Sequence, residues 1–376
     1  MRFIHTADWQ IGMTRRFLDA DAQARFSEAR ENAIRRIGEV VREHEAAFVV
    51  VAGDVFDANL LQPRTVRRAL DAMKDIPVPV YLLPGNHDHL GPVSIYQSAE
   101  FLRNKPDHVY VLENDHIIEA PGGVELVGVP WLAKRIVEDR VGQAIQTLPP
   151  KTGFPRVMVA HGTTSSMGGE DAVGVIYITI VEQALRNGQM DYLALGDRHS
   201  TTQCGGSGRI WYAGAPEPTD YDEVDAGNVL VVELGSGEPR VTPVHTGTWH
   251  FVEQVLDVEV GAAEAALERF LEALPDKART IVKVNFRGTI TVLDEMKLDA
   301  VLEQSRVAFG AIDRHEHRDQ LAVLSESGNF EDLALTGYAK EALGRLLESA
   351  SRLDASEGQR YRDALALYYR LVKEVQ

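Results

Sequence analysis

Five short apolar runs in the sequence each end in a polar residue or in a cluster of polar residues and glycine. The runs cover residues 3–7, 48–52, 78–84, 157–160 and 192–195. The side chains at or just beyond their ends that could bind a cation are Asp8, Gln10, Asp54, Asn86, His87, His161, Asp197 and His199. Mixed oxygen and imidazole ligands suit divalent ions such as manganese, iron or zinc. Two such ions about 3.5–4 Å apart can clamp a phosphoryl group and activate a water molecule.

Each of these residues alone has an ordinary structural explanation. An Asp after a strand most often caps a helix or forms a turn, and a single His is usually solvated or hydrogen-bonded. The informative feature is that all five clusters occupy the same structural position. Gly85-Asn86-His87-Asp88 is the most specific of them, because this tetrapeptide is unlikely to follow an aliphatic strand by chance.

The apolar runs predict the elements that would position these residues. Near-continuous apolar strands of four to eight residues favour a sheet that is covered on both faces. Apolar residues at helical spacing within residues 26–41 predict a helix, and residues 64–73 predict a second one. Strand, helix, strand indicates a layered α/β domain, in which ligands gather beyond the carboxyl ends of the strands.

The remainder of the chain changes in pattern near residue 249. Before it, residues 209–213, 229–234 and 240–244 read as further strands. After it, the expected order is strand 252–260, helix 262–274, strand 281–290, helix 293–304 and strand 320–324. We therefore predict a catalytic domain over 1–248, a small α+β domain over 249–330 and a helical segment over 331–376. That segment carries two apolar stripes, Leu343, Leu346, Leu347, Ala350 and Leu353, then Tyr361, Leu365, Tyr368, Leu371, Val372 and Val375.

The composition excludes several classes of protein. The 376 residues carry a formal charge of −17, which argues against a surface coated in positive charge for non-specific binding of nucleic acid. The single cysteine, Cys204, can form neither an internal disulfide nor a thiolate zinc cage, so a reducing compartment is expected. The sequence contains no signal-peptide core, and no apolar run approaches the ~20 residues of a membrane span. We therefore expect a soluble cytoplasmic protein without membrane partners. Neither a Gly-Lys phosphate loop nor a Gly-x-Ser-x-Gly elbow occurs.

Taken in order, the motifs resemble those of a known superfamily. Asp8-Trp9-Gln10, Gly53-Asp54-Val55-Phe56-Asp57, Gly85-Asn86-His87-Asp88, His161-Gly162 and Gly196-Asp197-Arg198-His199 look like the calcineurin-like metallophosphoesterases. Within that superfamily the chain most resembles the SbcD-type DNA repair nucleases, on His5-Thr6-Ala7-Asp8-Trp9 and Ala213-Gly214-Ala215-Pro216-Glu217. The resemblance covers residues 1 to about 245. It implies a layered β-sandwich flanked by helices, a small α+β capping domain that helps to place DNA, and C-terminal helices.

The resemblance also implies roles for the matching residues. Asp54 would bridge two metal ions, Asp8 and His199 would hold the first ion, and Asn86 and His161 would hold the second. His87 would stay off the metals, stabilise the scissile phosphate and assist the leaving group. Asp88 would orient His87, since a carboxylate behind an imidazole fixes its position.

Two positions depart from the family pattern. The family usually has Asp-x-His where this chain has Asp8-Trp9-Gln10, and Gly-His-x-His where it has Gly196-Asp197-Arg198-His199. Gln10 and Asp197 can still coordinate through oxygen. The shell is therefore harder and more anionic, which favours Mn²⁺, or Mg²⁺, over zinc. If either residue fails to bind, one ion is held weakly and activity is low.

Basic residues near the motifs are candidates for contacts with a phosphate backbone. They are Arg15, Arg16, Arg64, Arg68, Lys134 and Arg135. Each pair is equally explained as solvated helix or loop charge, and Trp9 and Trp131 as core residues rather than stacking platforms. The resemblance further implies a homodimer, with residues 64–73 as a candidate interface helix. It also implies an SbcC-like coiled-coil ATPase docked on the C-terminal helices, which could instead pack on their own domain.

The leading hypothesis is a metal-dependent DNA nuclease, with exonuclease and endonuclease activity in double-strand break repair. One alternative is a phosphodiesterase or phosphatase that acts on a small substrate. The segment from about residue 249 onward disfavours it, because a small substrate needs no such platform. The other alternative is a degenerate DNA-binding subunit, supported only by the changes at Gln10 and Asp197.

Overall fold

The computed structural model describes residues 1–135, 138–167, 175–235, 237–315, 318–324, 337–352 and 364. The chain divides into two compact units, which are described separately. Unit 1 consists of Met1–Arg16 and Gln23–Trp249, and unit 2 consists of Phe17–Ala22 and the chain from His250 onward.

The first sheet of unit 1 has six strands in the order β12-β11-β1-β2-β3-β4. Strands β1 to β4 run parallel to one another, and β11 and β12 continue the sheet in antiparallel pairing. Their bounds are β1 Arg2–Thr6, β2 Val49–Val51, β3 Val80–Leu82, β4 Val109–Val111, β11 Asn228–Glu233 and β12 Arg240–His245.

The second sheet also has six strands, in the order β5-β6-β7-β8-β10-β9. Strands β6, β7, β8 and β10 are parallel, and the edge strands β5 and β9 are antiparallel to their neighbours. Their bounds are β5 Ile117–Ala120, β6 Val124–Val129, β7 Arg156–His161, β8 Tyr192–Gly196, β9 Thr202–Cys204 and β10 Ile210–Tyr212. The five apolar runs are thus strands of two sheets, three in the first and two in the second.

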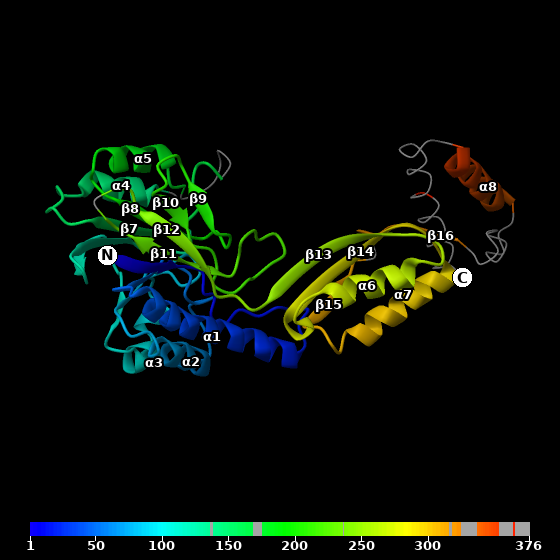
Figure 1. Cartoon of the computed structure of the whole chain (residues 1–376), viewed down its shortest axis with the longest axis horizontal. Coiled ribbons are helices and arrows are strands. Elements are labelled where there is room, and N and C mark those ends of the chain that lie inside the picture. Colours follow the sequence, from blue (N-terminus) through cyan, green and yellow to red (C-terminus); the bar gives the residue numbers. More distant parts are fainter. Residues whose placement is uncertain are drawn as a thin grey trace. The chain divides into compact units, whose positions relative to one another are not determined.

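Helices cover the outer face of each sheet, as Figure 1 shows, with α1 to α3 on one side of the pair and α4 and α5 on the other. The helices are α1 Ala20–His44, α2 Pro63–Met73, α3 Ala99–Asn104, α4 Arg140–Thr147 and α5 Ile178–Arg186, with a 3₁₀ turn at Ile95–Gln97. Pro63 opens α2, where its fixed φ suits the first helical position.

The core explains why the strands are apolar on both faces. Alternate residues such as Phe3 and Val50 pack between the two sheets against Val157 and Tyr192. The intervening residues, such as Ile4, pack under α1 and α2. Side chains alternate across a strand, so a strand between two packed layers must be apolar throughout. The expected layered β-sandwich flanked by helices is confirmed.

One buried polar residue bridges the sheets. His5, on β1, is fully buried, with Nδ1 3.0 Å from the Tyr192 hydroxyl and Nε2 3.1 Å from the Leu195 carbonyl oxygen. Burial lowers the pKa of His5 to about 3, although the hydrogen bond to Leu195 opposes this shift. The imidazole is therefore neutral near neutral pH, with Nε2–H donating to Leu195 and Nδ1 accepting from Tyr192.

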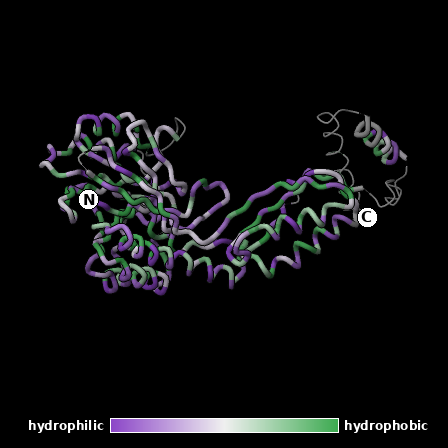
Figure 2. The backbone as a smooth tube through the Cα atoms, viewed as in Figure 1, coloured by the Kyte–Doolittle hydropathy of each residue, from purple (hydrophilic) through white to green (hydrophobic). Residues whose placement is uncertain are grey.

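Unit 2 is built on a parallel sheet. The long strand β14, Thr280–Thr291, pairs with β13, His250–Val258, along one edge. Along its other edge it pairs first with β15, Ala311–Arg314, and then with β16, Gln320–Leu324. The crossover helices are α6, Ala263–Ala273, and α7, Val292–Ser305, and a 3₁₀ turn spans Lys277–Arg279. In Figure 2 the tube through α6 alternates between hydrophobic and hydrophilic residues, in keeping with its buried Ala263, Leu267 and Leu271.

The C-terminal region contains one described helix, α8, Gly337–Arg352, whose Leu343 packs in the core of unit 2. The second apolar stripe, predicted from Tyr361 to Val375, lies outside the described residues. None of the helices in the described part of the chain is both long enough and apolar enough to cross a membrane.

Candidate metal centre

The predicted ligands lie at the carboxyl ends of five parallel strands. Asp8 follows β1, Asp54 follows β2 and Asn86 follows β3, while His161 is the last residue of β7 and Asp197 directly follows β8. The carboxyl ends of parallel strands meet at one edge of a sheet, so each sheet brings its own set of ligands to that edge.

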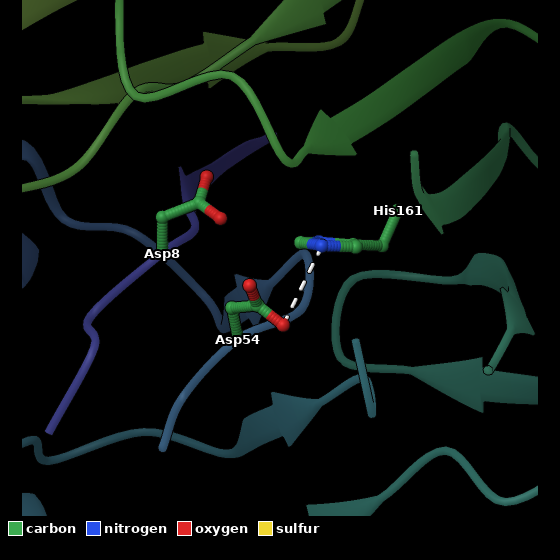
Figure 3. Close-up of side chains that lie close together, drawn as sticks. All are labelled: Asp8, Asp54 and His161. Carbon is green, nitrogen blue, oxygen red and sulfur yellow. Dashed lines mark ion pairs between the residues drawn. The ribbon is translucent and has the colours of Figure 1, made fainter. Parts of the chain in front are cut away.

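Ligand atoms of Asp8, Asp54 and His161 all lie within 4.8 Å of one another, and the three residues are buried. Figure 3 shows the two carboxylates and the imidazole facing one another, with Asp54 Oδ1 3.5 Å from His161 Nε2. The first and second sheets therefore contribute jointly to one cluster.

Oxygen atoms surround the Nε2 atom of His161. Asn86 Oδ1 lies 2.8 Å from it, Asp54 Oδ1 3.5 Å and Asp197 Oδ1 3.7 Å. The other ring nitrogen, Nδ1, lies 2.9 Å from the Ala52 carbonyl oxygen and donates to it, which leaves the Nε2 lone pair on this side. Carboxylate, amide and imidazole donors gathered around one point are ligands that divalent cations accept.

Gln10 is nearly fully buried, and only one of the two polar atoms of its amide has a hydrogen-bond partner. Nε2 donates to Asp54 Oδ2 at 3.0 Å, while Oε1 has no hydrogen-bond partner among the described residues. A buried amide oxygen without a donor is costly unless a cation or water satisfies it. Gln10 thus fits the ligand role that the sequence predicts for it.

The Asp8 carboxylate and His199 are oriented by neighbouring loops. Both oxygens of Asp8 lie 3.1 Å from the Asp197 backbone N–H, which donates to them. Nδ1 of His199 lies 2.7 Å from Thr219 Oγ1 and 3.1 Å from Glu223 Oε1. Nothing in the sequence marks Thr219 or Glu223 for this role, because a polar turn with neighbouring acids has the pattern of a solvated loop.

Backbone strain is concentrated at the same residues. Asp8, Gln10, Asp54 and Asp197 have φ values of 52°, 48°, 50° and 100°, in the region that favours glycine. Each such residue costs of order 1–3 kcal/mol and persists only where the surrounding structure enforces it. The chain adopts this conformation as it leaves the strands, which is typical of a functional site.

The glycines of the motifs permit close approach. A Cβ at Gly85 would lie 2.2 Å from Asp54 Oδ1, and one at Gly53 would lie 2.0 Å from His161 Nδ1. Both distances are much shorter than a van der Waals contact. These two positions must therefore be glycine for the carboxylate and the imidazole to keep their places.

His87 lies beside the cluster with its side chain 43% exposed. Its Nδ1 lies 2.8 Å from the Asp57 carbonyl oxygen and donates to it, and its Nε2 lies 4.0 Å from Asp54 Oδ2. The imidazole is thus anchored through Nδ1, with Nε2 near the Asp54 carboxylate.

Asp88 occupies a different position from the one expected beside His87. Its carboxylate accepts from Gly85 N at 2.7 Å, Phe56 N at 3.1 Å and the Tyr96 hydroxyl at 2.6 Å. Asp88 thereby links the loop that follows β2 to the loop that follows β3. The described hydrogen bond that orients His87 comes instead from the Asp57 carbonyl.

The electrostatics of the cluster favour a positive charge. Burial raises the pKa of Asp8 to about 7, against the attraction of His199 and His161. Burial would also raise the pKa of Asp54, but His161 and His87 hold it below its usual value. Burial would lower the pKa of His161, yet Asp54, Asp8 and Asp197 raise it well above its usual value. Protons and cations therefore compete for the same place among these groups.

The basic candidates fall into two groups. Arg15 donates to the Thr219 carbonyl and lies 3.5 Å from Asp220, and Arg68 lies 2.9 Å from Glu31. Both guanidinium groups thus already have internal partners. The remaining four residues of the set, Arg16, Arg64, Lys134 and Arg135, are exposed.

Trp9 and Trp131, the tryptophans near the motifs, both bond to the protein itself. Trp9 is 1% exposed and donates to Thr6 Oγ1 at 2.9 Å, so its predicted core role is confirmed. Trp131 is half-buried, and its indole N–H donates to the His161 carbonyl oxygen at 2.6 Å. Trp131 therefore braces the end of β7.

A cavity of about 320 Å³ has Asp197 and His199 in its wall, together with Thr219 and Glu223. A larger cavity of about 670 Å³ lies in unit 2 beside β13, β14 and α6. We place the candidate site beside the smaller one, because two of the predicted ligands, Asp197 and His199, line it.

Comparison with known proteins identifies the family. The model described as Calcineurin-like phosphoesterase matches residues 1–201, more than half of the chain, so the chain belongs to this family. Membership implies hydrolysis of phosphate esters at a centre of two metal ions, for which the cluster around Asp8, Asp54 and His161 is the candidate.

Several curated proteins are similar to this chain. The uncharacterized metallophosphoesterase YhaO of Bacillus subtilis is 26% identical over 215 residues, which cover 53% of this chain and 48% of the relative. The SbcD subunit of the nuclease SbcCD of Escherichia coli is 25% identical over 258 residues, covering 59% and 62%. Its counterpart of the same name from Rhodobacter capsulatus is 27% identical over 295 residues, covering 65% and 69%. The chain thus spans between half and about two thirds of the length of these relatives.

Proposed function

We propose that this protein is a metal-dependent phosphodiesterase that hydrolyses DNA, as an exonuclease and endonuclease in double-strand break repair. The observation that carries the proposal is the convergence of oxygen and nitrogen ligand atoms around His161 Nε2 and the unpartnered Oε1 of Gln10. Similarity to the SbcD subunits of SbcCD nucleases supports DNA as the substrate.

The ligands divide into two sets that share Asp54. The first site would comprise Asp8, Gln10, Asp54 and His199. The second would comprise Asp54, Asn86, His161 and Asp197. Three carboxylates and two amide oxygens among the donors favour Mn²⁺, with Mg²⁺ as the next choice. Ions bound there supply Lewis-acid stabilisation of the phosphoryl oxygens and a nucleophilic water.

His87 would act on the leaving group. Because Nδ1–H is committed to the Asp57 carbonyl, Nε2 carries a proton only when the ring is doubly protonated. In that form it can stabilise the scissile phosphate and donate the proton to the departing oxygen. Asp54 and Asp88 keep the loops around it in place.

The proposal extends to partners. The exposed residues Arg16, Arg64, Lys134 and Arg135 would contact the DNA backbone. We further propose that the protein forms a homodimer and lies in the cytoplasm. Residues 249–330 would cap the active site, and an SbcC-like coiled-coil ATPase would dock on the C-terminal helices.

Hydrolysis of three substrates tests the function. A linear DNA duplex, a cyclic dinucleotide and bis(p-nitrophenyl) phosphate are compared with and without Mn²⁺, with Asp54→Asn as the blank. We expect Mn²⁺-dependent cleavage of the duplex and nearly none by Asp54→Asn, because a neutral amide cannot neutralise two dications. Turnover restricted to the small substrates would indicate the alternative phosphodiesterase. DNA binding without any hydrolysis would indicate the degenerate subunit.

A further inference from the structure

The two imidazoles of the candidate centre are held in different ways. His161 donates from Nδ1 to a neutral backbone carbonyl, Ala52 O, at 2.9 Å. His199 instead directs Nδ1 at Thr219 Oγ1, 2.7 Å away, and at Glu223 Oε1, 3.1 Å away. Only His199, of these two, has a carboxylate behind it.

Glu223 is built into its place. Its side chain is 5% exposed, and its carboxylate also accepts from the Thr219 backbone N–H at 2.9 Å and from the Thr219 hydroxyl. Because the hydroxyl donates its proton to Glu223, its oxygen lone pairs face His199 and accept from Nδ1–H. The ring is thereby fixed in the tautomer that leaves Nε2 free to bind a cation.

The turn that carries Thr219 and Glu223 is itself anchored to α1. Arg30, 2% exposed on that helix, donates to the Glu217 carbonyl at 3.0 Å and to the Pro218 carbonyl at 3.1 Å. Its guanidinium carbon lies 4.3 Å from the centre of the Phe26 ring. These contacts fix the backbone from which Thr219 and Glu223 reach His199.

We propose that Glu223 is a positioning residue that sets the cation affinity of the first site through His199. The proposal rests on the proposed function for the assignment of His199 to that site. A carboxylate behind an imidazole orients the ring and raises its basicity, and loss of such a partner typically costs about 10–100-fold in metal affinity. The first site is also the one in which Gln10 offers an amide where the family usually has an imidazole. Glu223 strengthens the one imidazole that remains there.

Titration of the metal-free protein with MnCl₂ tests this, by calorimetry and by electron paramagnetic resonance of free Mn²⁺. The wild-type protein should bind two ions. Glu223→Ala should weaken one of them by about 10–100-fold and change the other by less than about threefold. Glu223→Gln keeps an acceptor for Nδ1 without the charge. Its affinity for the weakened ion should lie between those of the wild type and of Glu223→Ala. The matched control is Glu119→Gln, an exposed glutamate on β5 in which the same charge is removed and both affinities should be retained.

Thermal unfolding in EDTA shows whether each variant is folded, and Thr219→Val gives a second test should Glu223→Ala fail to fold. Wild-type affinities in both Glu223→Gln and Thr219→Val, or equal weakening of the two ions, would overturn the proposal. The titration needs no substrate, which separates it from the proposed function. A protein that binds two ions with the predicted Glu223 effect but cleaves no DNA would refute the function alone. Normal Mn²⁺ binding by folded variants of a DNA-cleaving protein would refute the role of Glu223 alone.

Discussion

His5 makes the stability of unit 1 depend on pH. Its folded-state pKa is about 3, against about 6.5 for an exposed histidine. Between these two values the unfolded chain binds a proton at this position and the folded chain does not, so the free energy of unfolding falls as pH decreases. The slope of about 1.4 kcal/mol per pH unit gives a loss of about 2–3 kcal/mol between pH 7.5 and 4.5, and of about 5 kcal/mol well below pH 3.

The substitution that isolates this effect is His5→Gln. A glutamine can accept from the Tyr192 hydroxyl and donate to the Leu195 carbonyl, yet it does not titrate. Urea unfolding in EDTA, followed by tryptophan fluorescence, gives the free energy of unfolding of both proteins at pH 7.5, 6.0 and 4.5. All other titrating groups are common to the two, so the wild-type protein should lose about 2–3 kcal/mol more than the variant over this range. His5→Phe also removes the titration but leaves Tyr192 and Leu195 without a hydrogen-bond partner. It should therefore be less stable than His5→Gln at every pH, with the same dependence of stability on pH. Parallel curves for wild type and His5→Gln would refute the reasoning.

Three further substitutions test the site and the scaffold. His87→Gln should bind Mn²⁺ normally but lower kcat about 10²–10⁴-fold, because it removes the proton donor; loss of Mn²⁺ from this variant would make His87 a ligand. Gly85→Ala should weaken Mn²⁺ binding by about tenfold or more, because its Cβ would meet the shared carboxylate at 2.2 Å, whereas Gly206→Ala meets nothing within 4 Å and should bind normally in the same titration. Arg156→Met should lower the free energy of unfolding in urea by about 3–5 kcal/mol, because Glu125, 2.6 Å from the fully buried guanidinium, would lose its countercharge. A loss under about 1 kcal/mol would show that Glu125 is solvated.

Local pattern was sufficient to predict the strands that carry the ligands. The runs ending before Asp8, Asp54 and Asn86 are β1, β2 and β3, and those at His161 and Asp197 are β7 and β8. Which of these strands belongs to which of the two sheets could not be predicted from local pattern. An apolar strand indicates that both of its faces are buried, but whether a helix or a second sheet covers a face depends on contacts distant in sequence.

The residues that orient the site were harder to predict than the ligands themselves. Glu223 lies 24 positions from His199, within a turn whose other acids are exposed or partly exposed, and nothing in its local sequence marks it as buried. Asp57 orients His87 through a backbone carbonyl, which any residue type provides. Arg15 was expected to contact DNA, whereas its guanidinium group binds the Thr219 carbonyl and lies near Asp220. Such roles follow from burial and distance, which the linear sequence does not contain.

The two departures from the family pattern become related once the geometry is known. In the proposed assignment each site has one carboxylate of its own, Asp8 in the first and Asp197 in the second, and both share Asp54. The family pattern, with an imidazole at the position of Asp197, would leave the second site with the shared carboxylate alone. Exchanging an imidazole for Asp197 in the second site therefore evens the anionic charge between the two ions. Exchanging another for Gln10 in the first site changes no charge but adds an oxygen donor. Because hard cations respond chiefly to anionic oxygen donors, this balance favours two similar ions such as Mn²⁺. The remaining asymmetry lies behind the imidazoles, where His199 alone has the carboxylate of Glu223.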